Sequence, residues 1–473
     1  MIYGYRLLSP CRAWGWHPYS SRFRRHGYLR GWYPAQTRDG RDYLSLSNGT
    51  RFMSTDYSPR TLYRLPWNFA DNAISWLEPT STCNLYCDGC YRENRAGSHK
   101  SLHEIQHELD VFEKLRKCDG VSIAGGEPLT HPEIVEIVRM VRRKGWKAII
   151  NSNGALLSLE LLRALKDAGV NGFTFHVDSG QKRLRWEGKS EIELNPLRQQ
   201  LADMLHEVGG ITCSFNATVY PETLQQVPAV LKWAQDNIDR VHVMVFINYR
   251  MAVLGKDFDF YVGDQQVHFD EMMYSKQDDS RRTDITSPEV VDVIRTMYPD
   301  FMPSAFLNGT ERPDTYKWLL AGRMGNRRKI FGYVGPRFIE IAQTWTHLTT
   351  GKYLAYADPS LQSKGRLYFL LAPFDKGMRR IVAKYFASLL RAPRAFFKRL
   401  HFQSVMIIQP ADILEHGTVN MCDGCPDITV WNDQLVWSCR MEEQSKWGQN
   451  VRMVPRQDAP PAIERHEVSD ASI

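Results

Sequence analysis

The sequence AISWLEPTSTCNLYCDGC, residues 73–90, joins a short apolar run to three cysteines. The run 73–79 has the length and composition of a buried strand. Five more apolar or β-branched runs follow and alternate with amphipathic helical stretches. These runs are GVSIAG (120–125), KAIINS (147–152), GFTFHVD (172–178), TCSFNATV (212–219) and RVHVMVFI (240–247). Strands that alternate with helices indicate βαβ units and a parallel sheet, so we predict an α/β fold with its chemistry at the carboxyl ends of the strands.

The helical stretches carry start and stop signals. Ser101 and Glu104 have the spacing of a capping box, and Gly145 follows a basic last turn. Ser158 is expected to cap a helix over 159–168, which Gly169 ends, and Pro221 is expected to open a helix over 222–234.

The cysteines Cys83, Cys87 and Cys90 are spaced CxxxCxxC directly after the first predicted strand. Three thiolates in one loop can hold a four-iron cluster and leave one iron open, which catalysis requires. A zinc site is the alternative, although only His99 is near enough in sequence to be a fourth ligand.

A second motif, Gly125-Gly126-Glu127-Pro128, follows the second predicted strand. Two glycines let a ligand approach the backbone closely, and Glu127 can accept a hydrogen bond from an ammonium group. Alone, this tetrapeptide is as typical of a turn as of a site. After CxxxCxxC it is a strong signal.

Together these motifs resemble the radical S-adenosylmethionine (radical SAM) superfamily, over about residues 74–249. The resemblance implies a partial (β/α)6 TIM barrel with a [4Fe-4S] cluster on Cys83, Cys87 and Cys90. It also implies that an electron donor such as flavodoxin or ferredoxin drives cleavage of SAM. The products are methionine and a 5′-deoxyadenosyl radical, which abstracts hydrogen from the substrate.

By position, the resemblance assigns Gly125, Gly126, Glu127 and Pro128 to the methionine end of SAM. Asn153 and Asp178 match family positions after the third and fourth strands. Two positions depart from the family. Gly89 stands where an aromatic residue usually packs on the adenine, with Tyr86 or Tyr91 as substitutes, and His176 stands where a small hydroxyl residue is usual. His176 is equally consistent with a buried, hydrogen-bonded histidine.

A second cysteine group consists of Cys422, Cys425 and Cys439, with a predicted hairpin, VWNDQLVWSC (430–439), leading into the last of them. Its spacing resembles the auxiliary cluster of the molybdenum cofactor biosynthesis enzyme that acts on GTP. The likeness is in spacing only, and it predicts a shortened, Twitch/SPASM-like domain with a second [4Fe-4S] cluster. A zinc site with His416 as fourth ligand, or unligated thiols, are the alternatives. Cys118 and Cys213 are predicted to be buried without a ligand, and Cys11 stands alone.

The net charge of +7 conceals a strong asymmetry. Residues 1–70 carry +8 and residues 323–399 carry +13, which leaves −14 on the rest. Within 376–402, apolar residues recur at helical spacing among cations, and a break follows at Pro393. Such a helix either covers the core or lies on an anionic membrane surface. Nucleic acid is the least favoured partner, because no RNA-binding fold is recognisable.

No run is long and apolar enough to span a membrane, and the first residues lack an apolar signal region, so we predict a cytoplasmic protein, peripheral at the membrane in one alternative. The substrate is predicted to be a peptide, a protein or a lipid. A non-catalytic iron–sulfur or zinc protein that binds a partner is the other functional class considered. The predicted segments are an aromatic and Arg-rich extension (1–70), the barrel (71–250), a basic extension of unassigned fold (251–415), the auxiliary cluster domain (416–453) and a mobile tail (454–473).

Overall fold

The computed structural model describes residues 57–249, 258–268, 284–357 and 359–456, all within the unit formed by residues 54–473. Predictions for Cys11, for most of the segment 1–70 and for most of the tail 454–473 therefore lie outside the described residues. Among the described helices, none combines the length and the apolar character needed to cross a membrane.

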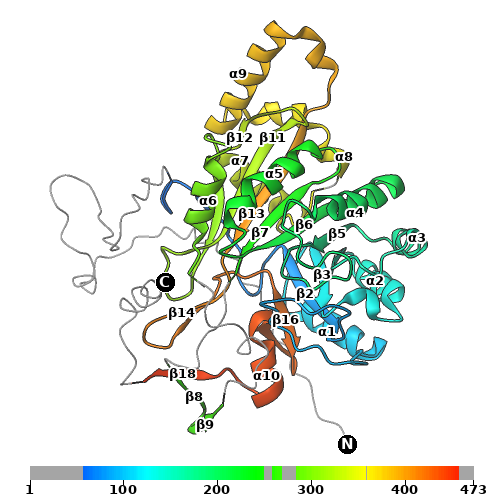
Figure 1. Cartoon of the computed structure of the whole chain (residues 1–473), viewed down its shortest axis with the longest axis vertical. Coiled ribbons are helices and arrows are strands. Elements are labelled where there is room, and N and C mark those ends of the chain that lie inside the picture. Colours follow the sequence, from blue (N-terminus) through cyan, green and yellow to red (C-terminus); the bar gives the residue numbers. More distant parts are fainter. Residues whose placement is uncertain (1–56, 250–257, 269–283, 358, 457–473) are drawn as a thin grey trace, which may run out of the picture. The chain divides into compact units, whose positions relative to one another are not determined.

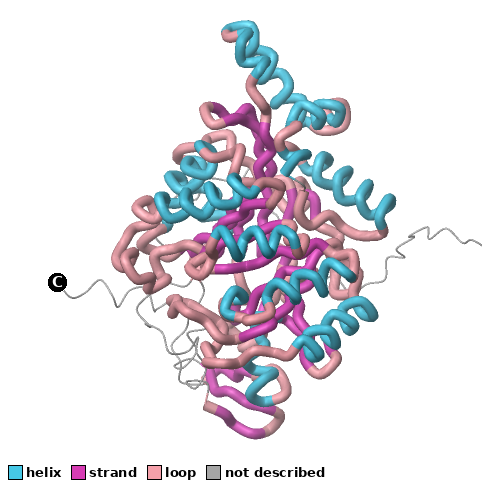
Figure 2. Tube along the Cα trace, turned by 90° about the vertical axis from the view of Figure 1, so that its right-hand side faces the viewer, coloured by secondary structure: helices cyan, strands magenta, loops and turns pink. Residues whose placement is uncertain are grey.

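Six parallel strands form the centre of the molecule and lie side by side in chain order (Figure 1). They are β2 (Ile74–Thr80), β3 (Gly120–Gly125), β4 (Lys147–Ser152), β5 (Gly172–His176), β6 (Thr212–Val219) and β7 (Val243–Asn248). The connecting helices are α1 (Leu102–Leu115), α2 (Ile134–Arg143), α3 (Leu159–Asp167), α4 (Asn195–Val208) and α5 (Val227–Asp236). Figure 2 shows a layer of helices in front of the strands. The predicted α/β fold is confirmed, and the strand order is that of a partial (β/α)6 barrel.

Most of the predicted helix ends are confirmed. Ser101 and Glu104 make both hydrogen bonds of the capping box, and the hydroxyl of Ser158 accepts from the backbone of Leu161. The prediction for Pro221 was wrong, because α5 begins at Val227, after a short 3₁₀ turn over Leu224–Gln226. Pro228 explains the difference. Proline lacks an N–H and fits only the first turn of a helix, so the helix starts just before it.

The extension whose fold the sequence did not reveal continues the same sheet beyond β7. Strand β13 (His401–Ile408) pairs parallel to β7, and β11 (Tyr316–Asn326) pairs antiparallel to β13. The sheet then adds β10 (Ala305–Asn308) and β1 (Tyr63–Arg64), while β12 (Lys329–Tyr333) pairs with β11. The other elements of the extension are α6 (Ser287–Arg295), α7 (Pro336–Thr350), α8 (Pro359–Gln362), η5 (Gly365–Leu371), α9 (Lys376–Arg391) and η6 (Pro393–Phe397).

Residues 258–267 pair with the end of the chain, and together with residues 412–437 they form small sheets in the lower half of Figure 1, whereas α9 is at its top. The predicted hairpin is confirmed as β16 (Ile428–Trp431) and β17 (Gln434–Trp437), with Asn432 and Asp433 at φ 45° and 60° in its turn. Positive φ at both central residues is typical of a type I′ turn. The remaining elements are β8 (Phe258–Val262), β9 (Gln265–Val267), β14 (Asp412–Ile413), β15 (Val419–Asn420), α10 (Met441–Trp447) and β18 (Arg452–Pro455).

Side chains alternate between two environments along the parallel strands. On β7, Met244 and Phe246 lie in the main apolar core, whereas Val243, Val245 and Ile247 line an internal cavity. Successive side chains of a strand point to opposite faces, so one face of the sheet supports the helices and the other surrounds the cavity.

Candidate active site

A cavity of about 1910 Å³ lies inside the sheet. Lumen-facing residues of every strand from β2 to β7, and of β11 and β13, line it. All six cysteines of the two groups line it too; they are Cys83, Cys87, Cys90, Cys422, Cys425 and Cys439. Two motifs that are more than 300 residues apart in sequence therefore face one space.

The first cysteine loop is held by the segment that follows β5. The backbone of Cys87 forms an isolated β-bridge with Gln181, and the N–H of Asp88 donates to the carbonyl of Gly180 at 2.9 Å. At its start, the N–H of Cys83 donates to the side chain of Asn94 at 2.9 Å. Backbone pairing at one end and the Asn94 side chain at the other therefore hold the loop without using the thiols of Cys83 and Cys87.

The thiols of the first group are free, and burial raises the pKa of Cys87. Gly89, between Cys87 and Cys90, has φ 76°, a left-handed conformation that favours glycine. A side chain at this position would strain the backbone. Three free thiols at the cavity wall are a donor set that fits a four-iron cluster. Across the described ranges, no three His, Cys, Asp or Glu side chains are grouped so as to hold a single metal ion.

The glycine pair at the end of β3 makes room for the segment that leads into the cysteine loop. A Cβ at Gly125 would clash with the carbonyl of Thr80, and one at Gly126 would clash with the carbonyl of Thr82. The N–H of Gly126 also donates to the carbonyl of Thr80 at 2.8 Å. These glycines therefore allow the backbone at Thr80 and Thr82 to pack closely against the end of β3.

Glu127 is buried, and both of its carboxylate oxygens accept from the protein. One oxygen accepts from the hydroxyl of Ser152 at 2.7 Å and the N–H of Leu129 at 3.0 Å, and the other accepts from the N–H of Asn153 at 2.7 Å. Burial raises the pKa of Glu127, while these donors act in the opposite direction. Glu127 thus ties the end of β3 to the end of β4.

Asn153 and Asp178 also lie at the cavity wall. The amide of Asn153 donates to Asn84 of the cysteine loop at 2.7 Å. One oxygen of Asp178 lies 2.6 Å from His176 Nε2, and Thr218 donates to the same oxygen through its N–H at 3.2 Å. Burial opposes ionisation of Asp178, but His176 and Thr218 outweigh it, so the pKa of Asp178 is lowered. His176 is half-buried and hydrogen-bonded, and its ring lines the cavity.

Arg183 is a site residue that the sequence analysis missed. It is buried, and its guanidinium donates to the carbonyls of Asn153 at 2.7 Å and His176 at 2.8 Å, and to the side chain of Gln181. It therefore connects the ends of β4 and β5 with the segment that pairs with the cysteine loop. It belongs to an irregular loop with no periodic pattern, so no sequence signal marked it.

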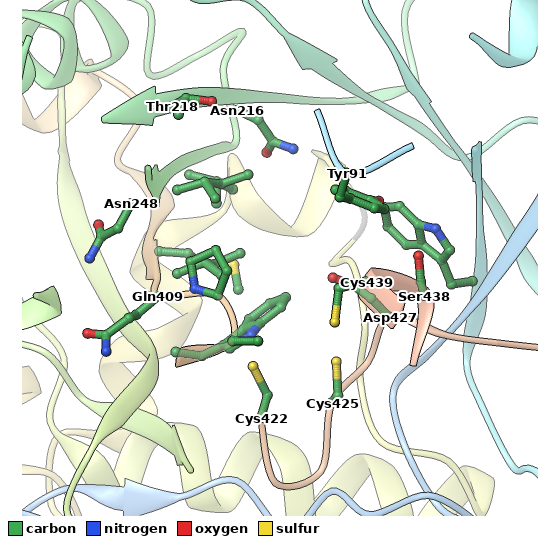
Figure 3. A pocket seen from close by; sticks show the side chains of 18 of the residues that line it. Tyr91, Asn216, Thr218, Asn248, Gln409, Cys422, Cys425, Asp427, Ser438 and Cys439 are labelled. Atoms are coloured by element: carbon green, nitrogen blue, oxygen red, sulfur yellow. The ribbon is translucent and has the colours of Figure 1, made fainter. Parts of the chain in front are cut away.

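The thiols of the second group converge on the same cavity (Figure 3). The thiol of Cys425 hydrogen-bonds to Cys422, which lowers the pKa of Cys422, whereas burial raises the pKa of Cys439 to about 12. Gly424 has φ 74°, close to the value for Gly89. The tetrapeptide Cys-Asp-Gly-Cys occurs at both 87–90 and 422–425, and this repetition is a sequence signal that we had not used.

The second group is anchored to residues that flank the start of the barrel. The side chain of Asn72, just before β2, donates to the carbonyl of Gly424 at 3.1 Å. The guanidinium of Arg116, after α1, donates to the carbonyl of Cys425 at 3.0 Å. The turn that carries Cys422 and Cys425 is therefore part of the barrel's own packing.

Asp427 is another residue that the sequence analysis missed. Asp427 lies two residues after Cys425 in the sequence, and its side chain lines the cavity. Figure 3 shows it beside Cys439. Burial raises the pKa of Asp427 to about 7, although Arg116 acts in the opposite direction. None of the described residues forms a hydrogen bond with its carboxylate, which leaves that group directed at the cavity.

A buried ionic cluster joins the two cysteine regions. Arg92, two residues after Cys90, lies 2.5 Å from Glu78 of β2 and donates to the carbonyl of Ser438 at 3.0 Å. Its other terminal nitrogen lies 3.3 Å from Glu442 of α10, and the hydroxyl of Ser438 donates to Glu78 at 2.7 Å. Since Ser438 precedes Cys439, a single arginine connects the loops of both groups.

The remaining cysteines and the proposed zinc ligand lie elsewhere. Cys118 and Cys213 are buried, as expected. His416 is exposed and is not part of the cavity wall that the second group lines.

Residues 77–234 match the model of the Radical SAM superfamily. The chain is 33% identical over 111 residues to the tungsten-containing aldehyde ferredoxin oxidoreductase cofactor-modifying protein of Pyrococcus furiosus, covering 22% of this chain and 30% of that protein. It is 25% identical over 184 residues to a probable GTP 3′,8-cyclase of Methanocaldococcus jannaschii, covering 37% and 59%. The Streptococcus suis SuiB structure bound to precursor peptide SuiA aligns at 19% identity and a TM-score of 0.31, covering 38% of this chain and 40% of that chain. The chain thus spans between about a third and three fifths of the length of these relatives.

Proposed function

Residues 77–234 are a radical SAM domain, and from this premise we propose that the chain is an enzyme whose substrate occupies the cavity between two iron–sulfur clusters. The observation that carries the proposal is that both cysteine groups line one cavity of about 1910 Å³. Its volume exceeds the usual 300–1,000 Å³ of a small-ligand pocket, so it has room for a cofactor and a substrate together.

In the proposed site, Cys83, Cys87 and Cys90 hold a [4Fe-4S] cluster that binds SAM at its open iron. The bound cluster and SAM supply a 5′-deoxyadenosyl radical that abstracts hydrogen from the substrate. Gly125, Gly126 and Glu127 would lie along the methionine end of SAM, with Asn153 and Asp178 next to them at the strand ends. Pro128 is buried and is not part of the cavity wall, so it would support this edge from behind. Because the Glu127 carboxylate already accepts from three protein donors, we assign it mainly to shaping this edge. Reduction requires an external electron donor, for which flavodoxin or ferredoxin is suitable.

In the second group, Cys422, Cys425 and Cys439 hold an auxiliary cluster that faces the substrate. A zinc site remains the alternative, and metal analysis separates the two. After anaerobic reconstitution, the wild-type chain should hold about eight iron and eight sulfide, and replacing either cysteine triad with alanine should leave about four of each. Cys118→Ala/Cys213→Ala is the matched control and should retain about eight. Four iron in the wild-type chain, unchanged in the Cys422→Ala/Cys425→Ala variant, would eliminate the auxiliary cluster.

The cavity wall favours a largely apolar substrate, which we propose is a lipid. Away from the cysteines, many of the side chains that line the cavity are apolar or aromatic; they include Val245, Ile247, Leu320, Ile339, Phe402 and Met406. The polar lining side chains drawn in Figure 3 include the uncharged Asn216, Thr218, Asn248 and Gln409, and the carboxylate of Asp427 beside Cys439.

Formation of 5′-deoxyadenosine tests the enzymatic proposal. The reconstituted chain should release it when SAM and dithionite are supplied, and Cys83→Ala should abolish it. A reconstituted chain that holds its clusters and releases none would favour the non-catalytic, partner-binding alternative. The substrate class is tested separately, because lipid extract, but not a peptide digest, should raise the rate.

A further inference from the structure

Exposed apolar side chains are concentrated in one part of the chain. Of the sixteen large hydrophobic residues that are exposed among the described residues, ten lie between Trp345 and Phe397. Seven of these belong to η5, α9, η6 and the turn between η5 and α9; they are Leu367, Leu370, Phe374, Phe386, Leu390, Phe396 and Phe397. We call residues 364–399 the basic face.

The basic face also has a strong excess of positive charge. It contains ten lysines and arginines and a single carboxylate, Asp375. Asp375 is buried, and one of its oxygens accepts from the N–H groups of Gly335 and Met378, so it caps α9 instead of facing solvent. Within the described residues, Lys384 is the one cation of this face that forms an ion pair, with Asp300 at 2.6 Å.

The packing of α9 leaves these apolar and basic side chains on the surface. One side of α9 buries Met378, Ile381 and Tyr385 beside β12, in the second apolar core. Another side is left with Phe386 at 52% exposure and Leu390 at 87%, next in sequence to Arg391. Figure 1 shows α9 at the top of the molecule. Helix α9 therefore does not fit the interpretation of a core-covering helix with only cations outside.

Elements around α9 complete the face. Phe386 packs against Phe369 of η5 at 6.3 Å between ring centres, and Arg366 of η5 stacks on Phe396 of η6 at 4.6 Å. Phe397, the next residue, is 86% exposed. Helix α9 and the two 3₁₀ helices η5 and η6 thus present leucines, phenylalanines and cations together.

From this we infer that the basic face docks on the surface of an anionic phospholipid bilayer. Leucine and phenylalanine side chains gain free energy by entering the acyl boundary, while lysine and arginine attract anionic headgroups. A cluster of exposed apolar side chains among polar ones marks a surface that binds a protein or a membrane. Two copies of the face would repel each other, because each carries a net charge of +9. Charge complementarity therefore selects the membrane over a second copy of the chain.

The basic face adjoins one end of the cavity. Tyr368 of η5 lines the cavity, whereas its neighbours Leu367 and Leu370 are exposed. A docked chain would thus bring the cavity close to the bilayer. Docking itself does not depend on the proposed function, since none of the face's residues is a cluster ligand.

Vesicle flotation of the full chain tests the inference. We expect the chain to float with vesicles of phosphatidylcholine and phosphatidylglycerol and not with phosphatidylcholine alone. Leu390→Gln/Phe397→Gln should lower the vesicle partition coefficient at least about tenfold. Arg391→Gln/Arg394→Gln should lower it by about tenfold or more at low salt and by less at high salt.

Matched controls exclude general effects of the substitutions. The exposed fraction of Leu184, 88%, is close to that of Leu390, but Leu184 lies outside the basic face. Leu184→Gln should therefore leave flotation unchanged. Arg139→Gln/Arg143→Gln on α2 removes the same charge elsewhere. Equal flotation of face and control variants would overturn the inference. The inference would also be overturned if the wild-type chain were a dimer that bound no vesicles and that Leu390→Gln/Phe397→Gln converted to a monomer. A third contrary outcome would be vesicle binding that appeared only after residues 1–56 were removed. Iron content measured on the same samples separates failed docking from a failed proposed function.

Discussion

The guanidinium of Arg92 lies 2.5 Å from the carboxylate of Glu78, and both side chains are almost completely buried. The pair is not isolated, because Ser438 donates to the same Glu78 oxygen and Glu442 lies on the other side of the guanidinium. A buried charge without a partner is costly, so this cluster makes the packing of the second cysteine region dependent on Arg92.

The first prediction concerns Arg92. Arg92→Ala leaves Glu78 and Glu442 without their buried partner and should lower the free energy of unfolding by about 3–5 kcal/mol. Arg139→Ala removes an exposed arginine that pairs with Glu136 on α2, away from this cluster, and should cost no more than about 1 kcal/mol. Denaturant unfolding of both variants measures the difference, and equal losses would contradict the role of the buried cluster.

Replacing both charges is a sharper test of Arg92. Glu78→Leu/Arg92→Met removes the ion pair but keeps the volume, so it should be considerably more stable than Arg92→Ala. If its clusters load normally while those of Arg92→Ala do not, the arginine acts through packing and not through its charge.

The second prediction concerns Gly424. Its φ of 74° strains any other residue, and a Cβ would clash with the carbonyl of Trp67. Gly424→Ala should therefore cost more than the roughly 1–2 kcal/mol of left-handed strain alone, and it should lower iron content by one cluster. Gly97→Ala is the control, because Gly97 has φ 70° but open space around its Cα. Similar stability losses for the two variants would show that the Trp67 contact is unimportant.

The third prediction concerns Gly180, which pairs with the first cysteine loop. A Cβ at Gly180 would overlap the hydroxyl of Tyr220, which itself donates to the carbonyl of Asp88 at 3.2 Å. Gly180→Ala should displace the loop and lower iron at the first site, measured in a chain whose second cysteine triad is replaced by alanine. Tyr220→Phe removes only the hydrogen bond, worth about 1 kcal/mol, and should retain the cluster. Full iron content in Gly180→Ala would contradict the prediction.

The fourth prediction concerns Glu127. Glu127→Gln places an amide NH₂ opposite an N–H or hydroxyl donor, so one of the three hydrogen bonds to the side chain is lost and a buried donor is left unsatisfied. We expect a loss of about 1–3 kcal/mol of stability together with weaker SAM binding, measured by calorimetric titration. Ser152→Ala removes one donor and leaves the carboxylate, so it should cost about 1 kcal/mol and bind SAM nearly as well. Unchanged stability in Glu127→Gln would show that the link between β3 and β4 is not important.

The barrel could be predicted closely from the sequence because its signals are local. Each predicted run became a strand within a few residues, from β2 at Ile74–Thr80 to β7 at Val243–Asn248. The helix over 222–234 was misplaced because Pro221 was preferred to Pro228 as its start. In the extension, β13 and β11 owe their places to pairing with distant strands, and such pairing leaves no periodic mark on either segment alone.

The candidate site could be predicted only where a motif names it. The cysteines and the glycine pair were found, but the reason for the glycines was not, since it depends on the approach of Thr80 and Thr82. Arg92, Arg183 and Asp427 escaped because each acts through partners from other segments. A charged residue in a loop is ordinarily a solvated one, and only the fold shows these three at the cavity or beneath it.

The contact between Arg92 and Ser438 has a consequence for synthesis. At about 5–20 residues per second, the ribosome makes Cys422 roughly 20 to 70 s after Cys90. During that interval the nascent barrel lacks Ser438 and Glu442, the buried partners of Arg92. The buried cluster around Arg92 can therefore close only after residue 442 has left the ribosome, so the packing of the first cysteine loop is completed by one of the last segments of the chain to be made.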